Sequence, residues 1–220
     1  LTGNMTVNNA DTNTVFANAS FSTTISGRQF NGQLSSPNIN DSMSNIEGFF
    51  AGAQAAEVGG AWVITKGSAA RNDGDSMASG VFRAKGSDIV DDNNHSSFWA
   101  GTYTRNYYGE NDEGDVFSGG FGSGSAETGD IKPDIGVGLY LDQSSDSTGI
   151  DRAVVLSGTQ NDYFGDYNYV AWGKWSDPSA DLKVYTSDWV VVDLLSSDQI
   201  PQQGSATYNG EVRGTIATIG

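Results

Sequence analysis

The chain of 220 residues has no Cys, and its 27 acidic against 11 basic residues give a formal net charge of −16. The absence of thiols excludes disulfides, thiolate metal sites and a cysteine nucleophile. The negative charge disfavours nucleic acids and anionic membrane surfaces as partners, and no apolar run reaches the roughly 18 residues that a transmembrane helix needs.

Polar and apolar residues alternate with a period of two along much of the chain, whereas helical periodicity is almost absent. Such alternation is typical of strands with one buried face. Clusters of Gly, Asn, Asp and Ser between the alternating stretches predict turns. In chain order, the predicted strands cover residues 14–26, 30–34, 46–51, 61–66, 80–85, 98–108, 116–121, 135–141, 153–157, 167–175, 189–195 and 205–216.

The first and last of these strands show which residues would face a core. Alternation in the first strand places on one face Val15, Ala17, Ala19, Phe21 and Ile25. Alternation in the last strand places on one face Ala206, Tyr208, Gly210, Val212, Gly214 and Ile216. Small residues among large ones suit the tapering interior of a small barrel. The sequence therefore predicts an all-β fold, an antiparallel β-barrel of about eight strands with an additional β-rich subdomain.

Residues 48–64 read G-F-F-A-G-A-Q-A-A-E-V-G-G-A-W-V-I. This stretch resembles a signature of the β-barrel domains of transferrin-binding protein B and related bacterial surface proteins, which combines an aromatic pair, a fixed Glu and a Gly pair at set spacing. Residues 79–85, S-G-V-F-R-A-K, match the last strand of those barrels, and residues 21–36 resemble their earlier strands. Ala53 stands where the family usually has Pro.

The resemblance implies a structural role for Glu57. In a short turn between two barrel strands, its carboxylate would accept hydrogen bonds from backbone N–H groups. Gly59 and Gly60 would then supply backbone angles that are open mainly to glycine.

The segments that resemble the family stand in permuted order along the chain. Residues 167–218 resemble strands that open the family's barrel region, whereas residues 1–86 resemble those that close it. Three explanations remain open: a circular permutant, one unit cut out of phase from a longer tandem protein, and a subunit whose C-terminal strands complete the barrel of the next copy.

This order predicts that N- and C-terminal segments complete the barrel together. We expect residues 1–86 to form the closing half of the barrel, 87–165 a β-rich insert or second subdomain, and 166–220 the opening strands, in their own or a neighbouring copy. The residues predicted to carry this assembly are Tyr208, Val212, Ile216, Val15 and Phe21.

Two groups of residues are candidates for ligand contact. Aromatic pairs at strand ends suit interfaces, which singles out Tyr107, Tyr108, Tyr163 and Phe164. The single histidine, His95, is either an axial haem ligand, as in some barrel proteins related to the family, or a solvated loop residue.

One acidic loop is a candidate Ca²⁺ site, because carboxylate oxygens are the ligands that Ca²⁺ prefers. It carries Asp112, Glu113 and Asp115, and its Gly109 and Gly114 flank four acidic or amide side chains. The alternative is a solvated acidic turn, and no other cofactor is expected.

Catalytic signatures such as G-x-S-x-G, a Walker loop or a dinucleotide fingerprint are absent from the sequence. We therefore expect a non-catalytic exported bacterial protein, extracellular or on the cell surface. Its expected role is that of a structural subunit that assembles head to tail with other copies by β-strand complementation. The alternative, implied by the resemblance, is a surface protein that captures haem, a metal or a host iron-carrier protein.

Overall fold

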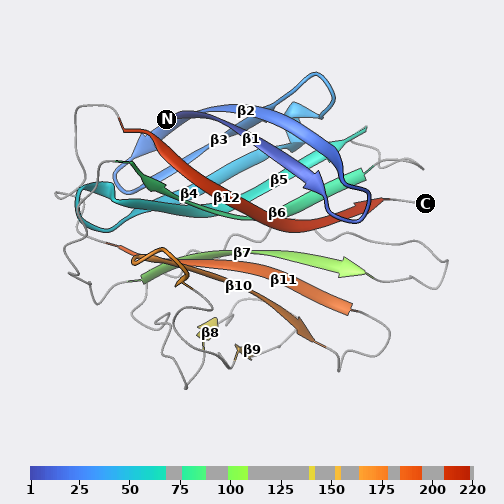
Figure 1. The fold of residues 1–220 in the computed structure, drawn as a ribbon. Helices are drawn as coiled ribbons and strands as arrows, with labels where there is room; N and C mark the ends of the chain where they lie inside the picture. The colour runs from blue at the N-terminus through green and yellow to red at the C-terminus, as the bar shows by residue number, and fades with distance from the viewer. Residues whose placement is uncertain are drawn as a thin grey trace.

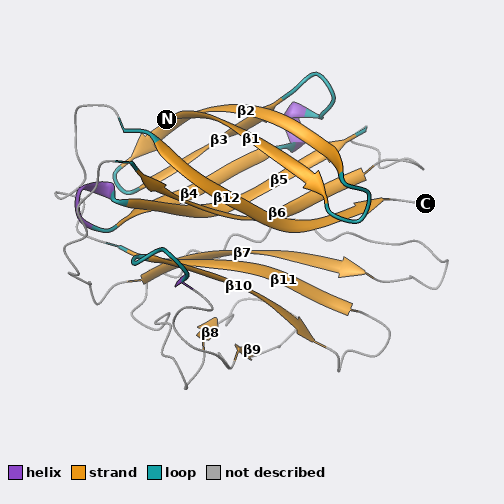
Figure 2. Ribbon diagram, in the orientation of Figure 1, coloured by secondary structure: helices purple, strands orange, loops and turns teal. Residues whose placement is uncertain are grey.

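The computed structural model describes residues 1–67, 76–87, 99–108, 139–141, 152–154, 164–177, 184–194 and 206–218. Strands dominate these residues, with short 3-10 turns at Asp41–Met43 and Ala53–Ala55 (Figure 2). Within the described part of the chain, no helix is long and apolar enough to cross a membrane.

The strands fall into three sheets (Figure 1). The largest sheet contains β1 (Thr2–Asn9), β2 (Thr14–Ser26), β3 (Gln29–Ser35), β4 (Asn45–Ala51), β5 (Glu57–Lys66), β6 (Ser76–Gly86) and β12 (Tyr208–Thr218). The second contains β10 (Val170–Asp177), β11 (Val184–Asp193) and β7 (Trp99–Tyr108), and the third contains β8 (Leu139–Leu141) and β9 (Arg152–Val154).

The largest sheet has seven strands in the order β1-β2-β3-β4-β5-β6-β12 and curls into a nearly closed barrel. Every neighbouring pair is antiparallel. The predicted all-β barrel is therefore confirmed, and so is the contribution of the C-terminal segment to it, because β12 pairs with β6 from Tyr208↔Gly86 to Thr218↔Ser76. The described strands of this sheet number seven against the eight or so expected, and β1 and β12, at its two ends, are not bonded to each other.

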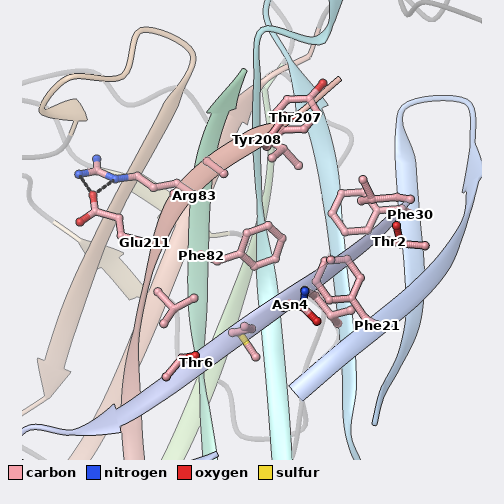
Figure 3. A pocket seen from close by; sticks show the side chains of 18 of the residues that line it. Thr2, Asn4, Thr6, Phe21, Phe30, Phe82, Arg83, Thr207, Tyr208 and Glu211 are labelled. Atoms are coloured by element: carbon pink, nitrogen blue, oxygen red, sulfur yellow. Dashed lines mark hydrogen bonds and ion pairs between the residues drawn. The ribbon is translucent and has the colours of Figure 1, made fainter. Parts of the chain in front are cut away.

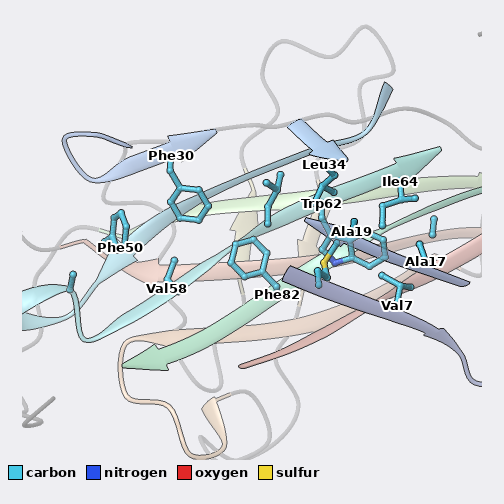
Figure 4. Close-up of a cluster of buried hydrophobic side chains, with 14 residues drawn as sticks. Val7, Ala17, Ala19, Phe30, Leu34, Phe50, Val58, Trp62, Ile64 and Phe82 are labelled. Carbon is cyan, nitrogen blue, oxygen red and sulfur yellow. The ribbon is translucent and has the colours of Figure 1, made fainter. Parts of the chain in front are cut away.

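The barrel interior holds a continuous apolar core (Figure 4). Leu34, Trp62 and Ile64 are almost completely buried in it, and burial of each such side chain stabilises the fold by roughly 1.5–3 kcal/mol. Glycines face each other across two strand pairs, Gly48↔Gly60 and Gly80↔Gly214. The first pair leaves room for the rings of Phe30 and Phe82, and the second lets the two backbones lie close together, as the predicted mixture of small and large inward residues requires.

The second sheet packs on the outer face of β4, β5 and β6. Its core side chains, such as Val170, Val190 and Val192, meet Phe49, Ala61 and Val81 of the barrel. Strand β5 is consequently buried on both faces. Strands β10 and β11 were expected among the opening strands of the barrel, but they belong to this second sheet; their runs of apolar residues cover the barrel wall from outside.

A β-bulge changes one predicted face. The register between β1 and β2 shifts between Val7 and Asn8, so that Val7 pairs with Ala17 and Asn8 pairs with Val15. Phe16 is the extra residue in β2, and beyond it the side chains of β2 switch faces. Ala17 and Ala19 face the core as predicted, but Val15 is 55% exposed and does not share their face.

Candidate functional site

Within the described residues, the barrel has an open seam between β1 and β12, which we define as the gap between the edges of these two strands that pair with no other described strand. Strand β1 pairs with β2 on one side, and β12 pairs with β6 on one side. Because each neighbour in the seven-stranded sheet is antiparallel, its first and last strands run in the same direction (Figure 1). An odd number of strands cannot close a barrel with antiparallel pairs throughout.

The side chains of the two edges alternate between the interior and the outer surface. On β1, Met5 and Val7 are buried in the core, whereas Asn4 and Thr6 are exposed. On β12, Tyr208, Val212 and Ile216 pack against the core and remain partly exposed. This is the inward face that alternation predicted for the last strand.

A cavity of about 790 Å³ opens at the seam and reaches into the barrel (Figure 3). Its walls come from both edges, at the end where β1 and β12 begin, and from interior residues such as Phe30, Val58 and Phe82. The ring of Phe21 lies over Gly3, where an added Cβ would come within 2.5 Å of its Cζ. Phe21 therefore lies inside the barrel next to the free edge of β1.

The first residue of β12 is anchored to the end of the barrel. The Tyr208 hydroxyl donates a hydrogen bond of 2.7 Å to the Ala55 carbonyl, and its ring lies 6.1 Å from that of Phe50. Burial raises the pKa of Tyr208 above its ordinary value. These contacts fix the beginning of β12 to the β4–β5 end of the barrel.

Arg83 on β6 connects β12 to the second sheet. It donates two hydrogen bonds to Oε1 of Glu211, from Nε at 2.8 Å and Nη2 at 2.6 Å (Figure 3). Its guanidinium lies between the rings of Tyr167 and Trp172, at 4.3 and 4.2 Å. A cation held between two aromatic faces is stabilised electrostatically, so Arg83 holds three segments of the chain together.

Phe164 takes part in this cluster through its backbone. Its carbonyl accepts a hydrogen bond of 2.8 Å from Nη1 of Arg83. Its side chain, predicted to contact a ligand, is only 7% exposed. Phe164 therefore lies in the junction between the barrel and the segment before β10, where its side chain offers little surface to a partner.

A second contact between β12 and the second sheet involves Arg213. Its Nε lies 3.5 Å from Oδ1 of the buried Asp188, and its guanidinium lies 5.3 Å from the Trp172 ring. The two charged residues of β12 are thus both engaged on the outer face of the barrel.

Glu57 has the structural role that the sequence predicted. Its two carboxylate oxygens accept hydrogen bonds of 2.8 Å from the backbone N–H groups of Asn168 and Tyr169. Burial raises the pKa of Glu57, and the bonds from the backbone and the charge of Lys85 oppose that rise. Glu57 therefore holds the segment before β10 against the barrel.

The predicted reason for Gly59 and Gly60 was wrong. Neither has a positive φ; the positive values in this turn belong to Gly52, Gln54 and Ala55. The two glycines are strand residues that lack space for a side chain. An added Cβ on Gly59 would lie 2.8 Å from Val192 Cγ1, and one on Gly60 would collide with the carbonyl oxygen of Glu47.

Several predicted site residues lie outside the described residues, namely His95, Tyr163, Asp112, Glu113 and Asp115. Tyr107 and Tyr108 end β7, where their backbones pair with Tyr185 and Val184. The described residues contain no group of three His, Cys, Asp or Glu that could hold a metal ion. The haem and Ca²⁺ hypotheses therefore stay predictions.

Sequence reasoning missed the edge strand β1 and the Arg83 cluster. In residues 2–9, T-G-N-M-T-V-N-N, two apolar side chains alternate with small polar ones. That weak alternation was the available signal for β1. The Arg83 cluster joins residues more than 80 positions apart, so no local sequence pattern could predict it.

A family model described as "C-lobe and N-lobe beta barrels of Tf-binding protein B" matches residues 1–86. These residues form a barrel segment of the Tf-binding protein B type. The comparisons with curated proteins and with solved structures gave no match. The matched segment ends with β6, so β12 completes the Tf-binding protein B-type segment from outside the matched range.

Proposed function

We propose that this protein is a non-catalytic structural subunit of a bacterial surface, which joins other copies by β-strand complementation. The observation that carries the proposal is the seam. Among the described strands, the barrel stops one short of antiparallel closure, and β1 and β12 each keep an edge that no described strand pairs with.

Free edges favour association because each presents backbone N–H and C=O groups that can pair with another strand. Strand β1 offers eight residues and β12 eleven. Complementation by a neighbouring copy would satisfy both edges at once. Repetition of the contact from copy to copy would give an open filament, since a head-to-tail interface need not close.

The surface location is supported by two features. The barrel segment is of the Tf-binding protein B type, and members of that family are bacterial surface proteins. The net charge of −16 favours solubility.

Light scattering of the purified chain over a range of concentrations tests this function, with negative-stain images of the same samples. We expect masses at multiples of the single chain and elongated particles. A single species with the mass of one chain at all concentrations would contradict self-assembly.

Capture of a ligand is the second candidate function. It is favoured by the match to a Tf-binding protein B barrel and by the cavity at the seam. Calorimetric titration of the chain with haem, with ferric iron and with a host iron-carrier protein separates the two functions. Binding of one of these ligands at one equivalent per chain would favour capture if light scattering showed that the protein remains a single chain.

A further inference from the structure

We propose that the seam accepts one extended strand of another polypeptide, which runs opposite to both β1 and β12. We further propose that this strand is uncharged and carries apolar side chains at alternate positions. The inference rests on the proposed complementation and names the direction and the chemistry of the strand that performs it.

The direction follows from the topology. Strands β1 and β12 run the same way, and each pairs antiparallel with its present neighbour. A single strand that runs opposite to both would form antiparallel ladders on its two sides and complete an eight-stranded barrel. A strand in the other direction would make two parallel ladders, which are slightly less stable per residue.

The inward side chains of the incoming strand would enter apolar surroundings. At the end of the seam where β1 and β12 begin, the cavity is lined by Phe21, Phe30 and Phe82. The inward positions at this end include Gly3 and Gly210, which present no side chain. An apolar side chain of the incoming strand would fill this space and remove apolar surface from water.

The position of the cavity also fixes where a large anchor belongs. The incoming strand would begin beside Asn9 and Thr218 and end beside Leu1 and Tyr208. The cavity lies at the latter end. A large apolar residue near the C-terminal end of the strand would therefore reach it, whereas one near the N-terminal end would not.

The charge pattern favours an uncharged partner. Strand β1 has no charged residue and no Pro, although edges of natural sheets are commonly protected by such residues. On β12 the charged side chains lie on the outer face of the barrel and have partners there: Glu211 pairs with Arg83 of β6, and Arg213 with Asp188 of β11. In a chain with a net charge of −16, an uncharged edge lets another strand approach without repulsion from the edge itself.

Peptide probes test this site. They are added while the full chain refolds from urea, before another copy of the chain can occupy the seam. The probe is an end-blocked ten-residue peptide of alternating Val and Thr, with Phe replacing the Val nearest its C-terminus. Fluorescence anisotropy of a labelled peptide measures binding. A peptide with Asp at two inward positions should bind at least about tenfold more weakly, because a buried charge without a partner is costly.

Disulfide coupling tests the direction, since the chain has no Cys of its own. Asn8→Cys and Thr2→Cys place single thiols at opposite ends of the exposed face of β1. A peptide with an added N-terminal Cys should couple to the Asn8→Cys chain several times faster than to the Thr2→Cys chain. A peptide with a C-terminal Cys should show the reverse preference.

The outcomes separate this inference from self-assembly. Peptide binding with this polarity to a chain that remains a single copy would support the strand site and overturn self-assembly. Absence of binding, equal coupling at the two ends, or the opposite polarity would overturn the strand site. If the chain nevertheless formed filaments, assembly would use another surface.

Discussion

Arg83 on β6 and Glu211 on β12 share two hydrogen bonds, although they are 128 positions apart in the sequence. This pair ties the last described strand of the chain to the strand that ends the matched segment. The same guanidinium also lies between Tyr167 and Trp172. The barrel, its completing strand and the second sheet therefore meet at one side chain.

We predict that Arg83→Met lowers the free energy of unfolding by about 2–4 kcal/mol, because it removes two cation–π contacts and the charged hydrogen bond to the Phe164 carbonyl. Glu211→Gln should cost less than about 1 kcal/mol, because the Glu211 side chain is 51% exposed. Urea unfolding followed by Trp fluorescence measures both values. Equal losses in the two variants would show that the ion pair, and not the stacking, is the main contribution of Arg83.

We predict that Glu57→Gln destabilises the protein by about 1–3 kcal/mol, since an amide NH2 would then face a backbone N–H of Asn168 or Tyr169. The loss should depend on pH. Burial raises the folded-state pKa of Glu57 above 4.5, so its protonated form is favoured by folding. Its contribution is therefore fully present below that unfolded value and is lost as the pH rises through the folded-state pKa.

The measurement compares urea unfolding of the parent and of the Glu57→Gln variant from about pH 4 to about pH 7. The difference in unfolding free energy between them should shrink as the pH rises. Carboxyl groups common to both chains cancel in this difference. A difference that stays constant, or that grows towards neutral pH, would show that the folded-state pKa of Glu57 is not raised.

The sequence predicted those features that depend on neighbouring residues. Alternation placed Tyr208, Val212 and Ile216 on the inward face, and the motif around Glu57 predicted bonds from the backbone. It could not predict the outward turn of Val15, because a bulge depends on the register with β1. The seam could not be predicted either. Whether the number of barrel strands is odd or even follows only once β10 and β11 are known to belong to the second sheet.

We predict that Gly60→Ala is more destabilising than Gly59→Ala. A Cβ on Gly60 would meet the Glu47 carbonyl oxygen and the Gly48 Cα, which are backbone atoms of a paired strand. A Cβ on Gly59 would meet the ends of Val side chains of the second sheet, which can shift. Thermal unfolding of the two variants measures the order, and the reverse order would contradict the proposed role of backbone contact.

The most direct test of the role of β12 uses its two faces. Val212→Asp together with Ile216→Asp places two charges at partly exposed positions that pack against the apolar core, and together they should cost several kcal/mol. Because folded domains are stable by only about 5–15 kcal/mol, the double variant should lose the cooperative melting transition and any assembly. Thr207→Asp with Asn209→Asp adds the same charge at exposed positions and should melt within a few degrees of the parent. Circular dichroism and light scattering give both readouts, and a core variant that melts and assembles like the parent would show that β12 does not complete the barrel.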